Sequence, residues 1–200
     1  MVTARVAPIE RRSPTQLDTA RARALVGLAD IPTIVAMGPF DDDAYARQLA
    51  TAFIAVRRHC TAQLVLVGAG CRRTSVTRRI FAHGLGCDVH AVHASSDDRW
   101  PDLVAAADLV VLSGSSGNTT LLDVLAAGRP VIAPDDPATV QLVVPAIAGI
   151  TYRPGDVAGL GGALLRLLTT PVLCHGMGGR ARQVARRRHL ENIGRIQSAG

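Results

Sequence analysis

Small polar residues gather in the stretch SGSSGNTT, which begins at Ser113 and follows an apolar run typical of a buried strand. The members that offer groups to a ligand are Ser115, Ser116, Gly117, Asn118 and Thr119. Their hydroxyl and amide groups would add to the unpaired N–H donors of a helix N-terminus, whose dipole favours an anion such as phosphate. The stretch predicts a phosphate-binding loop, unless Asn118 or Thr119 serves only as the N-cap of the helix.

One carboxylate, Asp123, follows this loop within the otherwise apolar sequence TTLLDVLAA. A carboxylate only accepts hydrogen bonds, so it suits a vicinal diol such as that of ribose. The alternative is that Asp123 lies on the polar stripe of an amphipathic helix and faces solvent. The pattern by itself supports both interpretations.

Two glycine-containing turns follow other apolar runs and are further candidates for the same site. One holds Gly38, and the other is Gly68-Ala69-Gly70. Glycine lets the backbone approach a ligand closely. The second turn is only half of a GxGxxG motif, because Arg73 stands at the third glycine position, so a plain tight turn explains it equally well. Arg73 would either pair with a phosphate or face solvent.

Short apolar strands alternate with amphipathic helices along the chain and must position these loops. Predicted strands cover 33–37, 63–67, 88–92, 108–112, 129–133 and 149–152. Predicted helices cover 18–25, 44–58, 74–84, 98–106, a segment after the polar loop, 138–144, 155–168 and 177–190. The alternation predicts an α/β fold, a Rossmann-like doubly wound parallel sheet in a single domain. In such sheets ligands bind beyond the carboxyl ends of the strands, where all three loops leave.

The domain organisation follows from the same pattern. We expect a linker and short helix over 1–30, the Rossmann-like domain over 31–192, and a tail over 193–200.

The charge pattern argues against several partners. All 22 basic residues are arginine, and the net charge is +6. The arginines are scattered apart from the run Arg186–Arg188, without interleaved aromatic residues, which favours solvated helix faces over nucleic-acid binding, with weak contact to an anionic surface as the alternative. At most a peripheral membrane contact is therefore expected.

Cysteine and histidine spacing predicts neither a metal site nor a cofactor. Four widely spaced cysteines form no CxxC pair, and six scattered histidines form no HxxxH pair. We see no membrane-spanning apolar run and no signal-peptide pattern, so a reduced, cytoplasmic location is expected.

Five segments, in order, resemble the C-terminal half of a GT-B glycosyltransferase, in particular the large retaining family often called family 4. They are PTIVAMG, QLVLVGAG, AADLVVLSGS, LLDVLAAGRPVIA and GITYRPGD, between Val6 and Asn192. The segment SGNTTLLDVLAAG also resembles a motif of inverting GT-B enzymes that use UDP-N-acetylglucosamine. The resemblance implies that this half binds a nucleotide diphosphate sugar, with Asp123 on the ribose hydroxyls and the loop before it on the phosphates or sugar.

The chain departs from that family's pattern at the phosphate-binding positions. Pro39 stands at the family's arginine position and Ala44 at its lysine position, and Asp41–Asp43 add negative charge nearby. Ser115 stands at the position of the family's first glutamate. His93 replaces a glycine after the third strand, where it would stack on or bond a base, or simply be solvated.

Three functions remain open on the sequence. The first is a glycosyltransferase component that binds a UDP-sugar by preference and works with a separate or missing acceptor half, or through self-association. The second is a degenerate, non-catalytic GT-B domain that acts in binding or association. The third is another Rossmann class, such as a dinucleotide or phosphosugar-isomerase-like binder. No catalytic residue is predicted, and the base, the sugar, the acceptor and the stereochemistry are left undetermined.

Overall fold

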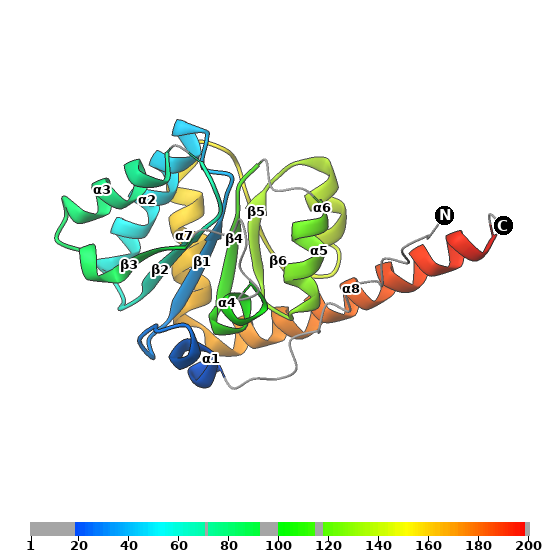
Figure 1. Ribbon diagram of the computed structural model, residues 1–200. Helices are drawn as coiled ribbons and strands as arrows, with labels where there is room; N and C mark the ends of the chain where they lie inside the picture. Colours follow the sequence, from blue (N-terminus) through cyan, green and yellow to red (C-terminus); the bar gives the residue numbers. More distant parts are fainter. Residues whose placement is uncertain (1–18, 71, 93–99, 115–117, 199–200) are drawn as a thin grey trace, which may run out of the picture.

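The computed structural model describes residues 19–70, 72–92, 100–114 and 118–198, and it shows a six-stranded, wholly parallel sheet. The strands are β1 (Thr33–Met37), β2 (Gln63–Val67), β3 (Val89–Val92), β4 (Leu109–Leu112), β5 (Val131–Pro134) and β6 (Gly149–Tyr152). Their spatial order is β3-β2-β1-β4-β5-β6 (Figure 1). The chain therefore winds outward from β1 in one direction and, after β3, from β4 in the other, as in a Rossmann fold.

Helices cover both faces of the sheet. One face carries α2 (Asp43–Arg57), α3 (Arg73–Phe81) and α7 (Val157–Thr169); the other carries α1 (Thr19–Leu25), α4 (Trp100–Ala106), α5 (Asn118–Ala126) and α6 (Pro137–Val143). Successive strand residues point to opposite faces of the sheet. Ile34 packs in the core under α2, α3 and α7, and Val35 packs in the core on the other face. This burial on both faces explains why the strands read as unbroken apolar runs.

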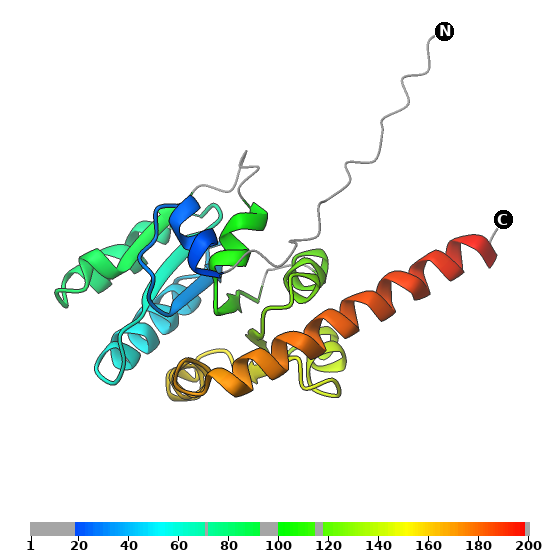
Figure 2. The ribbon, with the colours of Figure 1, turned by 90° about the horizontal axis from the view of Figure 1, so that it is seen from below.

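The last helix, α8 (Pro171–Ser198), connects the two layers and continues past them. Met177 packs in the core beneath α2 and α7, and Ala181 packs in the core beneath α4 and α5. Beyond that point α8 projects from the body of the domain (Figure 2).

The prediction of a Rossmann-like, doubly wound parallel sheet is confirmed, with differences at element ends. The last helix begins at Pro171 rather than near 177, and it runs to Ser198 rather than ending near 190. The third strand starts at Val89 because a 3-10 turn, η1 (Gly86–Asp88), precedes it. The remaining strands and helices lie within a few residues of their predicted ranges.

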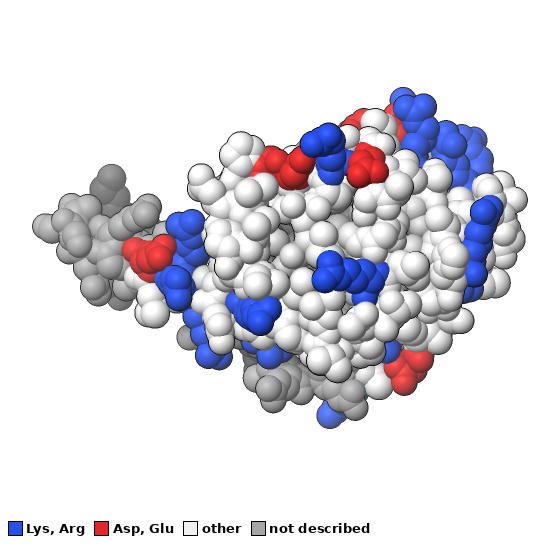
Figure 3. Space-filling view, turned by 180° about the vertical axis from the view of Figure 1, so that it is seen from behind, with Lys and Arg blue, Asp and Glu red and all other residues white. Residues whose placement is uncertain are grey.

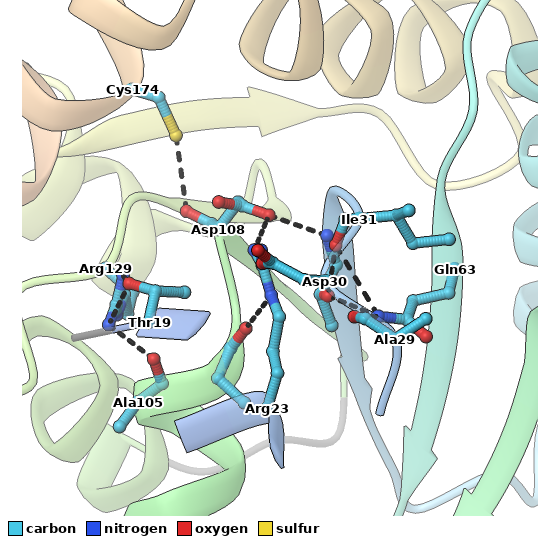
Figure 4. A network of polar contacts seen from close by, with 12 residues as sticks. Thr19, Arg23, Ala29, Asp30, Ile31, Gln63, Ala105, Asp108, Arg129 and Cys174 are labelled. Atoms are coloured by element: carbon cyan, nitrogen blue, oxygen red, sulfur yellow. Dashed lines mark hydrogen bonds and ion pairs between the residues drawn. The ribbon is translucent and has the colours of Figure 1, made fainter. Parts of the chain in front are cut away.

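The predicted short helix at the start, α1, is tied into the domain by Arg23. This buried side chain donates to Asp108 Oδ2 at 2.6 Å, to Asp30 Oδ1 at 2.7 Å and to the carbonyl of Ala106 at 3.1 Å (Figure 4). Asp108 also accepts from the backbone N–H of Thr33 at 2.6 Å, so one network joins α1, α4 and the starts of β1 and β4.

Within the described ranges, no single helix combines the length and apolarity needed to cross a bilayer. The segments Val157–Thr169 and Pro171–Glu191 meet that test only as a pair, and the chain turns by 100° between them.

Candidate functional site

The topological switch lies between β1 and β4, which are neighbours in the sheet but whose following connections run to opposite sides. The backbone N–H of Ser113, just after β4, donates to the carbonyl of Met37, the last residue of β1, at 3.3 Å. The sequence-predicted loops at Gly38 and Ser113 therefore start side by side at the carboxyl edge of the sheet, where ligands bind in this fold class.

The two glycine turns at this edge are built against each other. The N–H of Phe40 donates to the carbonyl of Ala69 at 2.9 Å, and the N–H of Arg72 donates to the carbonyl of Phe40 at 2.8 Å. A Cβ atom on Gly70, whose φ is +131°, would lie 2.5 Å from the backbone of Phe40. A Cβ atom on Gly68, at φ +125°, would lie 3.2 Å from the backbone nitrogen of Gly38, which is a tight but milder contact. Contact between the loops is thus a sufficient physical reason for these glycines.

Some backbone donors at this edge stay available to a ligand. Over the ranges that the structure describes, the N–H groups of Ala69 and Gly70 donate to no protein acceptor. The bond between Gly38 and Pro39 is cis, and Pro39 has no N–H to offer. The second glycine turn therefore presents more donors than the first.

Arg73 neither faces solvent freely nor projects away from the sheet. It is half-buried at the start of α3, and its Nη1 donates to the carbonyls of Gly68 at 3.0 Å and Val92 at 3.2 Å. The side chain thereby joins the carboxyl ends of β2 and β3 and holds a positive charge at this edge.

The acidic run Asp41–Asp43 is engaged in local contacts. Asp42 is the N-cap of α2 and accepts from the N–H of Ala44 at 2.8 Å. Asp43 approaches Arg47 at 3.2 Å and Arg72 at 3.9 Å. Because these groups are partly exposed, the pairs are weak, but they place arginine charge beside the carboxylates.

A helix follows the polar stretch in the sequence, as predicted, and this helix, α5, begins at Asn118. Asp123 lies in its second turn and is partly buried, whereas Leu121, Val124 and Leu125 of the same helix are buried in the core. Several predicted site residues fall outside the described part: Ser115, Ser116, Gly117 and His93 entirely, and the side chains of Asn118 and Thr119.

An aromatic cluster at this edge was missed by sequence reasoning. Phe40 and Tyr45 stack with ring centroids 5.9 Å apart, and the Tyr152 hydroxyl donates to the carbonyl of Leu112 at 3.2 Å. The Tyr45 hydroxyl is buried and makes no hydrogen bond among the described residues. Burial, and then Tyr152, raises the pKa of Tyr45 well above its ordinary value, so the phenol stays neutral. Since the chain has only two tyrosines, their positions after a loop and at a strand end were the available signal.

No three His, Cys, Asp or Glu side chains in the described ranges lie together as a metal site would require. Arginine side chains are spread over separate places on the rear face of the molecule rather than joined into one basic surface (Figure 3).

Solved structures share this fold. Sucrose-phosphate synthase from Thermosynechococcus elongatus is 23% identical with a TM-score of 0.69, over 90% of this chain and 49% of that one. HepE of Anabaena, crystallised with UDP and glucose, is 18% identical with a TM-score of 0.73, over 92% of this chain and 52% of that one. This chain thus spans about half the length of each. The C-terminal domain of the glycosyl transferase LpcC from Francisella tularensis matches over 80% of this chain and 88% of that domain, at 17% identity and a TM-score of 0.69.

Among curated proteins, none matches this chain significantly. A family comparison gives a match across residues 31–170, which is most of the chain, to the family described as glycosyl transferases group 1. The half-sized domain and its structural relatives agree with the expected resemblance to the C-terminal half of a GT-B enzyme. The chain therefore belongs to the glycosyl transferases group 1 family.

Proposed function

We propose that this domain binds a nucleotide diphosphate sugar, UDP-linked by preference, at the carboxyl edge between β1 and β4. The observation that carries the proposal is the strand order, because it brings the loops after β1 and β4 together beside the start of α5. Family membership and the UDP found with the structurally similar HepE support it.

Each part of the edge has a chemical role in this proposal. We expect amides of the stretch 115–119, which leads into α5 in the sequence, to meet the diphosphate, and the N–H groups of Ala69 and Gly70 to provide further donors. Asp123 accepts hydrogen bonds from the ribose hydroxyls. Arg73 contributes positive charge from the far side of the glycine turn.

Preorganised donors of this kind also stabilise the diphosphate as it leaves during glycosyl transfer. No general base or nucleophile is assigned, so we expect the isolated chain to transfer no sugar. An acceptor-binding half, on a separate chain or elsewhere in the protein, would complete the enzyme.

Free thiols at Cys60, Cys87 and Cys174 agree with the cytoplasmic location that we propose.

Calorimetry with UDP, GDP and UDP-glucose tests the proposal. We expect submillimolar binding of UDP to the wild type and binding at least about tenfold weaker in Asp123→Asn, which keeps the side-chain shape but removes a charged acceptor. Glu191→Gln is the matched control, because Glu191 is exposed on α8 and pairs with Arg188. Equal affinity in the wild type and Asp123→Asn would exclude the proposed ribose contact.

A degenerate, non-catalytic domain is the second candidate. It is favoured by Pro39 and Ala44 at the family's basic positions and by the carboxylates at Asp41–Asp43. No heat of binding with any of the three ligands, from a folded sample, would favour this function over the first.

A further inference from the structure

The opposite edge of the sheet, where the strands begin, holds a cavity of about 230 Å³. It lies between the end of α7, the first turns of α8 and the turn Gly128–Pro130 that leads into β5. We propose that this cavity binds a small oxyanion of the phosphate class, held by Arg129 and Arg182. The inference does not rest on the proposed nucleotide site, because the two sites lie at opposite ends of the strands.

Arg129 supplies a partly buried cation with an unused hydrogen-bond donor. Its Nη2 donates to the carbonyl of Ala105 at 2.5 Å, and Nη1 and Nη2 lie 3.3 and 3.4 Å from the Thr19 hydroxyl (Figure 4). Its Nε is buried and has no acceptor among the described residues. Burial lowers the pKa of Arg129, which means that its charge lacks full compensation in the folded chain.

Arg182 adds a second guanidinium from α8. Its side chain lies over Gly128, where any Cβ atom would collide with it. Neither Arg182 nor Arg129 forms a salt bridge within the described ranges. Asp108 favours the charge on Arg129, whereas Arg182 and Arg23 oppose it, so an anion here would relieve the repulsion among the arginines.

One carboxylate, Asp108, lines the cavity, and one of its oxygens already accepts two hydrogen bonds. Its Oδ2 accepts from Arg23 and from the N–H of Thr33, both at 2.6 Å. Cys174 donates its thiol hydrogen to the main-chain carbonyl of Asp108 at 3.2 Å, and burial raises the pKa of that thiol to about 11, so it adds no negative charge. Counting Arg23, Arg129 and Arg182 against Asp108 and Asp30, the cluster keeps a net positive charge.

The size and geometry of the cavity select the ligand class. Pockets for drug-sized molecules measure roughly 300–1,000 Å³, so this cavity suits a smaller group. Guanidinium groups bind the oxygens of phosphate in paired hydrogen bonds, which two arginines that line one cavity can supply together. Inorganic phosphate and a compact phosphate monoester share this chemistry.

Thermal unfolding of the full chain, with sodium phosphate or phenyl phosphate replacing sodium chloride at constant ionic strength, tests the site. We expect the wild-type Tm to rise with ligand concentration in a saturable way. Arg182→Gln should weaken apparent binding about tenfold or more, since it removes a charged donor. Arg180→Gln, an exposed arginine on the same helix that does not line the cavity, should bind like the wild type.

A second variant adds a negative charge to the cavity without removing an arginine, so it tests the site even if Arg182→Gln fails to fold. Gly179 lines the cavity on α8, and a Cβ atom there meets nothing within 4 Å. Gly179→Glu should fold, because glutamate has a higher helix propensity than glycine, and its negative charge should repel the anion from the cavity. Gly162→Glu on α7, equally open and outside the cavity, is its control.

The outcomes separate this site from the proposed nucleotide site. Phosphate stabilisation that survives in Asp123→Asn but is lost in Gly179→Glu and Arg182→Gln supports the cavity, and the stronger of the two probes identifies free phosphate or a monoester. No saturable rise in the wild type, or an equal rise in the cavity variants, overturns the proposal.

Discussion

One carboxylate at the carboxyl edge of the sheet, Asp136, has a structural role. Asp136 is the N-cap of α6, and its Oδ1 accepts from the N–H groups of Ala138 and Thr139, both at 3.1 Å. Partial burial by itself would raise the pKa of Asp136, but a hydrogen bond from the Thr139 side chain and those from the backbone outweigh it, so the pKa is lower than in the unfolded chain. The Asp136 cap therefore stabilises the fold fully above about pH 3.9, the ordinary pKa of an aspartate. This stabilisation is lost as the pH falls through the lower pKa that Asp136 has in the folded chain.

Asp136→Asn tests this pH dependence, because asparagine caps a helix about as well but does not titrate. We expect similar urea unfolding of the two proteins at pH 6 and a steeper loss of stability in the wild type on going toward pH 3. Parallel changes of unfolding free energy with pH would show that the Asp136 carboxylate is not coupled to folding.

The local structure around Asp123 could be predicted because it depends on residues that are close in sequence. The polar loop, the helix after it and the carboxylate in its second turn all follow from one short stretch. The place of Tyr152 beside Tyr45 depends on how β6 lies relative to α2, which no local pattern records. Likewise, the sequence predicts either a phosphate contact or solvent exposure for Arg73, and neither includes its bond to the carbonyl of Val92 on the neighbouring strand.

At the scale of elements, the two glycine turns behave as one interlocked unit. Gly70→Ala should lower the free energy of unfolding by about 2–4 kcal/mol, since it adds a clash with the backbone of Phe40 to a positive φ. Gly84→Ala separates the two causes: φ there is +74° with nothing within 4 Å, so a loss of only about 1 kcal/mol is expected. Equal losses in urea unfolding would mean that the turns do not press on each other.

Strands were predictable as elements because burial on both faces leaves unbroken apolar runs. The start of α8 was not, because Gly176, Gly178 and Gly179 lower the helix propensity of that stretch. The structure gives a reason for one of them, since a Cβ atom on Gly178 would collide with the carbonyl of Gly128. Tertiary packing thus overrides local preference at this helix start.

At the scale of the whole molecule, the alternation of strands and helices, with the right-handed crossovers usual for parallel strands, restricts the sheet to few orders. The sequence could not show how far α8 projects, because that depends on where its packing against the other helices ends.

Association is predicted for a domain that corresponds to half of a GT-B enzyme. The exposed large apolar residues in the described part lie on several elements, and Leu190 is the one on the outer part of α8. Light scattering at high concentration should give a mass above 21.0 kDa, reduced by Leu190→Glu but not by Phe81→Glu on α3. A mass of 21.0 kDa at every concentration would contradict the prediction.

The central claim is that a nucleotide diphosphate occupies the edge between β1 and β4. The most direct measurement is a titration of ¹⁵N-labelled protein with UDP, followed by the backbone amide signals. The account predicts saturable shifts concentrated at Gly68–Gly70, Gly114 and the first turns of α5 through Asp123. Shifts centred instead on Arg129 and the start of α8, or the absence of any shift in a folded sample, would contradict it.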